Sequence, residues 1–371
     1  MRDEIKRKLD QINELYPKSR LERSKERWRR LWHGEDPLDR LPFVAYPLTV
    51  AYYDDVDTPE QRLMRSLDEF IWRGFFADDF IPAFFTGCRQ ATIPSMFGAK
   101  EVVVGSDYSC VRLLHTPEDL DRLEPARVLP GSLAESWLRM QQYFVEETDG
   151  QIPVHVTDMQ GPVDVAGQLW GYDNLLAAAY VDPDRYFRLL TLTSDAFIHF
   201  WNAQKDVIGQ ERFVGTHLFA WDWIPEDCGA TLSADSMVMV SPDYYEVYYA
   251  PFHSKIGEVF GGFTVHSCGD FSKAIPAINR TPHIRGINAG QMSVEQLVEN
   301  GIDKRLVIIA NSGMDDADRL FSLIKSEHLR ADVTIHPWPC NENRGRPQFW
   351  TKEDRLFVKR NEEHLLELAS V

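Results

Sequence analysis

The chain has 371 residues, of which 44% are hydrophobic and 12% aromatic, and its formal net charge at pH 7 is −17. This length and composition allow one large buried core, of the size that a single (β/α)8 barrel has. The acidic balance argues against nucleic acid as a partner, because a negatively charged surface repels phosphate backbones.

Residues 1–40 are predicted to form a helical extension ahead of the main body, because apolar residues recur among charged ones at helical spacing. In the basic stretch 18–32, Glu22 and Glu26 alternate with positive residues, which is typical of a solvated, ion-paired helix. The charged start lacks the apolar core of a signal peptide, and no run reaches the roughly 18 apolar residues of a membrane span. The five cysteines then suit free thiols, so we expect a cytoplasmic protein without a membrane partner.

The main body, residues 41–371, begins with a predicted strand at 43–50. Residues 51–150 follow and are too long for a simple connection. They contain a helical stretch at 58–80 and a short β-like run at 100–107. We therefore expect an inserted lobe over the mouth of the main body.

Eight β-rich runs occur along the chain, and helical stretches separate most of them. The runs are 43–50, 152–158, 212–220, 235–241, 263–268, 284–290, 305–313 and 332–338. This alternation indicates a parallel α/β fold, and eight strands favour a (β/α)8 TIM barrel over an open doubly wound sheet. No glycine-rich phosphate loop follows any run, which argues against dinucleotide binding.

His266 and Cys268 end the predicted strand "FTVHSC". Their i, i+2 spacing directs both side chains to one face of an extended chain, and reactive residues of a barrel lie at such carboxyl ends. Gly269 allows the chain to curl and to bring the sulfur towards the imidazole. The two residues are therefore candidate metal ligands, although buried strand residues without a ligand role remain an alternative.

Cys340 occupies the matching position after the last predicted strand. One histidine and two cysteines would leave one position of a tetrahedral zinc open, as in catalytic sites. His336 precedes Cys340 by four residues and is interpreted as a core histidine. Cys88, Cys110 and Cys228 lack such a context and are interpreted as buried small apolar residues.

Asp222 and Asp235 are the candidate catalytic carboxylates. Asp222 lies between Trp221 and Trp223, a setting suited to an aromatic or methylated substrate, although a loop acid that caps backbone amides is the alternative. A carboxylate of this kind could fill the fourth zinc position before substrate arrives. Asp235 paired with Asp158 would also suit glycoside hydrolysis, whereas a Ser-His-Asp hydrolase is poorly supported because no G-x-S-x-G turn occurs.

Several segments, taken in order, resemble the uroporphyrinogen decarboxylase superfamily over residues 24–350. They are "GEDPLDRLPFVAYP" (34–47), the Gly-Pro segment with its apolar helix and Asp-Pro break (159–190), 233–256, "VHSCGD" (265–270) and "HPWPCNEN" (336–343). The resemblance implies a TIM barrel. The first strand lacks the arginine-rich segment with which the decarboxylases bind substrate carboxylates, so porphyrinogen decarboxylation is not expected.

The other branch of that superfamily comprises zinc-dependent methyltransferases that work with corrinoid proteins, and its motif is His-x-Cys followed by a distant Cys. His266, Cys268 and Cys340 match this motif. The segment before the last cysteine departs from the usual small residues, because it contains Trp338. The resemblance implies the metal ligands, but it does not transfer the substrate.

The function implied is methyl transfer between a small substrate and the cobalt of a corrinoid (cobalamin) carried by a partner protein, with Zn2+ as the metal. The aromatic content favours O-demethylation of a methoxylated aromatic substrate. Methylation of a thiol by methyl-corrinoid is the reverse direction. A decarboxylase-like lyase and a binding barrel without catalysis are the remaining alternatives.

Overall fold

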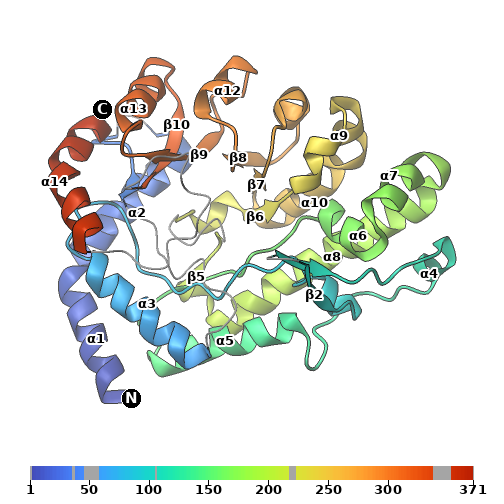
Figure 1. Ribbon diagram of the computed structural model, residues 1–371, viewed down its shortest axis with the longest axis horizontal. Helices are drawn as coiled ribbons and strands as arrows, with labels where there is room; N and C mark the ends of the chain where they lie inside the picture. The colour runs from blue at the N-terminus through green and yellow to red at the C-terminus, as the bar shows by residue number, and fades with distance from the viewer. Residues whose placement is uncertain are drawn as a thin grey trace.

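A parallel sheet of six strands lies at the centre of the structure (Figure 1). This computed structural model describes residues 2–35, 38–45, 58–104, 107–216, 223–336 and 352–370. The sheet order is β1-β10-β9-β8-β7-β6. Its strands are β1 (Phe43–Ala45), β6 (Ala230–Ser233), β7 (Phe263–Ser267), β8 (Ile284–Ala289), β9 (Val307–Gly313) and β10 (Arg330–His336). The fold is thus mixed α/β with a parallel sheet, as the alternation of strands and helices predicted.

Helices surround this sheet (Figure 1). They are α1 (Arg2–Leu15), α2 (Lys18–His33), α3 (Pro59–Arg73), α4 (Pro117–Asp121), α5 (Leu133–Glu147), α6 (Pro162–Trp170), α7 (Tyr172–Val181), α8 (Pro183–Ile208), α9 (Pro242–Tyr248), α10 (Ala250–Phe260), α11 (Ile275–Ile278), α12 (Val294–Glu299), α13 (Ala317–Ser326) and α14 (Lys352–Ala369). Local sequence fixes where some helices begin. At the start of α12, for example, Ser293 and Gln296 form a capping box. Within the described part of the chain, no helix is long and apolar enough to cross a membrane.

Strands β1 and β10, the first and last in chain order, are neighbours in the sheet and pair in parallel, which is the pairing that a barrel requires. Elsewhere, β4 (Val154–His155) pairs in parallel with β5 (Phe213–Val214). A parallel bridge between Gln160 and Ser233 connects the chain beyond β4 to β6. Closure of all strands into one barrel remains a prediction.

The prediction of a strand at 235–241 is wrong. Residues Asp235–Met239 form the 3-10 helix η5, and the strand of this region, β6, lies just before it. The buried carboxylate of Asp164 in α6 accepts hydrogen bonds from the backbone N–H groups of Asp235 (2.6 Å) and Ser236 (3.1 Å). These tertiary bonds hold the chain in a turn, and they override the β-propensity of the apolar residues.

The predicted N-terminal helices are present as α1 and α2, and α2 contacts β10. Trp28 and Trp32 of α2 are buried, and a Cβ placed on Gly286 of β8 would come within 2.9 Å of the Trp32 ring. Buried Asp79 is also bonded to α2, because its carboxylate accepts hydrogen bonds from Arg27 Nη1 at 2.8 Å and from Ser24 Oγ at 3.2 Å. Packing and ion pairs together fix the end of α2 against the sheet.

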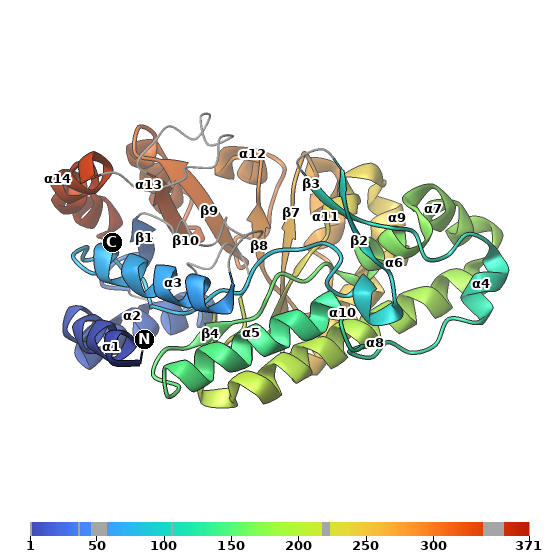
Figure 2. The ribbon, with the colours of Figure 1, turned by 60° about the horizontal axis from the view of Figure 1, so that its bottom comes forward.

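The segment predicted as an inserted lobe contains α3, α4, α5 and a hairpin of β2 (Glu101–Val104) and β3 (Asp107–Cys110). Part of it runs beside the strands, because Phe84 forms a parallel bridge with Val154. Helix α5 packs along α8 on one side of the molecule (Figure 2). The division of the chain into extension, lobe and barrel stays a prediction.

Candidate metal centre

The carboxyl ends of β6 and β7 bring together Asp235, His266 and Cys268, three of the five site residues expected from the sequence. Asp235 follows β6 by two residues, His266 belongs to β7, and Cys268 is the first residue after β7. One ligand atom from each lies within 4.8 Å of the other two. Parallel pairing of Ser233 with His266 sets this proximity, because it aligns the two strand ends.

His266 is oriented by Asn288 of the neighbouring strand β8. Its Nδ1 lies 2.5 Å from Asn288 Oδ1, and the Asn288 side-chain amide donates to the carbonyl oxygen of Ile309 at 3.2 Å. Since an amide oxygen can only accept, Nδ1 carries the proton, and Nε2 presents its lone pair. Metal-binding histidines are commonly held in this tautomer by such a partner. Nothing in the sequence distinguished Asn288 from other polar residues at strand ends.

Cys268 completes the pair, with its Sγ 3.3 Å from His266 Nε2. Gly269 has φ of +79°, the left-handed conformation that turns the chain directly after the cysteine. Burial, followed by the negative charge of Asp235, raises the pKa of the Cys268 thiol to about 12. A cation at this position would offset both effects and favour the thiolate.

Asp235 reaches the pair from the first position of η5. Its Oδ1 lies 3.7 Å from His266 Nε2 and accepts a hydrogen bond from the Cys268 backbone N–H at 2.7 Å. Buried Asp164 holds this turn through its bonds to Asp235 and Ser236, and Tyr249 donates to Ser236 Oγ at 3.0 Å. Burial and the neighbouring Asp235 carboxylate raise the pKa of Asp164 to about 7. The turn that presents Asp235 is therefore specified by α6, far away in the sequence.

These three side chains suit a tetrahedral metal. Imidazole, thiolate and carboxylate ligands of one zinc ion lie about 3.3–3.6 Å apart, as its bond lengths require. The Nε2–Sγ and Nε2–Oδ1 distances of 3.3 and 3.7 Å fall close to these values. Gly290 keeps space beside them, because a Cβ there would lie 2.9 Å from His266 Cε1 and 3.6 Å from Cys268 Sγ. The two distances from His266 Nε2 would thus need only small changes to suit such an ion.

Asp158 lies near this cluster, in the chain just beyond β4. Its carboxylate accepts hydrogen bonds from Cys88 Sγ at 3.1 Å and Ser233 Oγ at 3.5 Å, and its charge contributes to the raised pKa of Cys268. Cys88 is exposed and Cys110 is half-buried, so the expectation that both are buried apolar residues is wrong.

The remaining expected site residues, Asp222 and Cys340, lie outside the described residues. Trp223, which flanks Asp222 in the sequence, is described and lines a pocket near the start of β6 together with Arg29 and His33. His336 ends β10 and is buried, as expected for a core histidine, and burial lowers its pKa to about 4.

Comparison with known proteins gives a structural likeness only. The structure is similar to that of a methyltransferase from Methanosarcina mazei, with a TM-score of 0.64 and 15% sequence identity over 92% of this chain and 99% of that chain. No protein-family model and no curated protein matches the sequence. At this identity the likeness establishes a shared α/β fold.

Proposed function

We propose that this chain is a corrinoid-dependent methyltransferase, in which a closed (β/α)8 barrel holds zinc through His266, Cys268 and Cys340. The observation that carries the proposal is the cluster of Asp235, His266 and Cys268 at the carboxyl ends of β6 and β7. Its ligand types match the His-x-Cys pattern of the sequence, and Asn288 holds His266 in the tautomer that binds metals. The likeness to a methyltransferase structure agrees with this class of reaction.

The reaction proposed is displacement at a methyl carbon. A corrinoid partner would supply Co(I) as the nucleophile for the methyl group of a methoxylated aromatic compound. The carbon–oxygen bond would break, and the phenolate would leave with the bonding electron pair. Zinc supplies a Lewis acid with an open position, which stabilises negative charge on the departing oxygen. In the reverse direction, a thiol would lose its proton to solvent and its sulfur would form a bond to the methyl carbon of methyl-cobalt, while the cobalt–carbon bond breaks and Co(I) leaves with the electron pair.

The chain's own residues prepare this site. Asn288 and the β7 backbone orient the imidazole, and Gly290 leaves room next to it. Asp235 fixes the Cys268 backbone and lies near enough to His266 to occupy the fourth position until substrate displaces it. Asp222 is the second proposed catalytic carboxylate. We propose that a corrinoid protein docks at this edge of the sheet and that the chain acts in the cytoplasm.

The test combines metal content with methyl transfer. His266→Ala, Cys268→Ala and Cys340→Ala should each contain about one equivalent of zinc less than wild type, whereas Cys110→Ala, which alters a half-buried cysteine of the β2–β3 hairpin, should match wild type. Wild type should methylate Co(I) cobalamin with methoxybenzoates, as followed by the absorbance change. A second arm supplies methylcobalamin and a small thiol, so that turnover in one arm assigns the direction. Zinc that is unaffected by the three substitutions would overturn the proposal.

A further inference from the structure

A second group of one histidine, one aspartate and one cysteine lies at the other end of β6. His33 is the last residue of α2, and Asp227 and Cys228 belong to the 3-10 helix η4 (Glu226–Cys228), just before β6 begins at Ala230. One ligand atom from each lies within 4.8 Å of the other two. We propose that His33, Asp227 and Cys228 bind a transition metal ion of the zinc class, at a site separate from Asp235, His266 and Cys268.

The distances fit such an ion. His33 Nε2 lies 2.9 Å from Asp227 Oδ2, and Cys228 Sγ lies 3.9 Å from both His33 Nε2 and Asp227 Oδ1. Ligands of a tetrahedral zinc ion lie about 3.3–3.6 Å apart. The two distances from His33 Nε2, to Asp227 Oδ2 and to Cys228 Sγ, therefore have to change by only about half an ångström, which the rotation of an exposed imidazole or carboxylate supplies.

Glycines with positive φ shape the backbone next to the group. Gly34 ends α2 in the left-handed conformation with φ of +70°, directly after His33, and the neighbouring Trp32 is buried. Gly229 follows Cys228 with φ of +101°, and a Cβ there would lie 1.8 Å from the carbonyl oxygen of Gly262. Glycine is therefore required at position 229, where this backbone conformation and the close approach of Gly262 exclude a Cβ.

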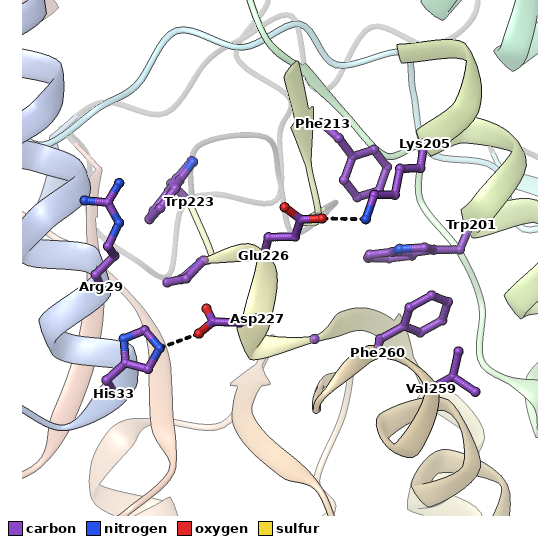
Figure 3. Close-up of a pocket in the computed structure, with 13 residues that line it drawn as sticks. Arg29, His33, Trp201, Lys205, Phe213, Trp223, Glu226, Asp227, Val259 and Phe260 are labelled. Carbon is purple, nitrogen blue, oxygen red and sulfur yellow. Dashed lines mark hydrogen bonds and ion pairs between the residues drawn. The ribbon is translucent and has the colours of Figure 1, made fainter. Parts of the chain in front are cut away.

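The group borders a pocket of about 650 Å3 (Figure 3). His33 and Asp227 line one side of the pocket, whereas its other side is aromatic and is formed by Trp201, Phe213 and Phe260. Cys228 is only 3% exposed and is not among the residues that line the pocket. An ion held there has three protein ligands and faces the pocket, where water or a small aromatic donor can take the fourth position.

The ligand set selects the class of ion. Thiolate and imidazole favour zinc, cobalt or copper, whereas magnesium and calcium prefer oxygen ligands. Glu226, the other acid of η4, is paired with Lys205 across the pocket at 2.5 Å. Glu226 is therefore a neighbouring carboxylate that is not a ligand of the proposed site.

An ordinary surface ion pair between His33 and Asp227 is the competing interpretation, and it predicts no metal affinity. The experiment uses full-length protein that has been stripped with a chelator and titrated with Co2+, which reports thiolate ligation by its near-ultraviolet charge-transfer absorbance. It is run in a His266→Ala, Cys268→Ser background, so that the strand-end site does not contribute. This background should still bind about one equivalent, as three intact protein ligands allow.

Adding His33→Gln or Cys228→Ser should abolish this binding and its thiolate absorbance. His33→Gln keeps a side chain that can donate to Asp227, and Cys228→Ser keeps the size of the residue, so circular dichroism should show folded protein in both. Glu226→Gln is the matched control and should bind as the background does. No thiolate absorbance in the background, or equal binding in all variants, would overturn the proposal. Because the readout excludes the strand-end ligands, the result is independent of methyl transfer.

Discussion

The groups at the two ends of β6 contain the same three residue types but are built differently. Beyond its carboxyl end, the ligands come from a strand and from a turn held by buried Asp164. Before its amino end, they come from the last residue of a helix and from η4. The His266 side chain is 9% exposed and bonded to Asn288, whereas the His33 side chain is 36% exposed.

The difference in exposure and hydrogen bonding indicates how far the ligand side chains of each group are already held in position before any metal binds. The strand-end group has its imidazole tautomer and its aspartate position set by hydrogen bonds from other elements, so little freedom is lost on binding. Among the described residues, His33 contacts only Asp227 and Cys228 in its polar interactions. We therefore expect tighter binding and chemistry at the first group, and weaker, more adaptable binding at the second.

The largest expected effect is the loss of methyl transfer in His266→Ala. Under the proposed mechanism, the zinc ion would not be held without the imidazole, so turnover should fall on the order of 10³-fold or more. The rate is measured with methoxybenzoates and Co(I) cobalamin. His33→Ala should leave the rate within about twofold, because a site at the other end of β6 takes no part in this step. Equal losses in the two variants would contradict the division of roles.

Acid should destabilise the metal-free protein through a third kind of histidine, His253, which is buried in α10. Burial lowers the pKa of His253 from 6.5 to about 3. Between these pH values the unfolded chain binds the proton and the folded chain does not, so stability falls as pH drops below about 6.5. His253→Leu should remove an acid-dependent loss on the order of a few kcal/mol in urea unfolding between pH 4 and 7. His364→Leu, at an exposed position, is the control.

Removing the partner of His266 should have an intermediate effect. In Asn288→Ala the imidazole loses the acceptor for Nδ1, and metal affinity should fall about 10- to 100-fold. Competition with a coloured chelator measures the affinity. Asn288→Asp restores an acceptor and should recover part of it, which a role limited to packing would not explain. Unchanged affinity in Asn288→Ala would show that His266 needs no such support.

The smallest effect is expected at the exposed group without metal. His33→Gln removes an ion pair between side chains that are 36% and 70% exposed. Such pairs contribute about 0–1 kcal/mol, so urea unfolding of the metal-free variant should differ from wild type by no more than this. With excess zinc the two should separate, because an ion bound only to the folded wild type stabilises it. A larger difference in the free energy of unfolding without metal would show that the pair of His33 and Asp227 itself stabilises the fold.

The strands and helices were mostly predictable because their signals are local. Strand–helix alternation and β-rich runs indicated β7, β8, β9 and β10 close to their observed bounds. The run at 235–241 failed, because bonds from Asp164 in a distant helix decide its conformation. Nothing in the sequence of residues 235–241 indicates that the buried Asp164 carboxylate accepts hydrogen bonds from their backbone.

The sequence by itself determined that His266 and Cys268 share one face, since the i, i+2 spacing of an extended chain requires it. The turn at Gly269 was also foreseeable, because glycine readily adopts positive φ. Tertiary structure alone decided that Asp235 joins them, that Asn288 orients the imidazole, and that His33 meets Asp227 and Cys228 across almost 200 residues of chain. These contacts depend on strand register and helix docking, which arise from burial of the whole core and not from any short pattern.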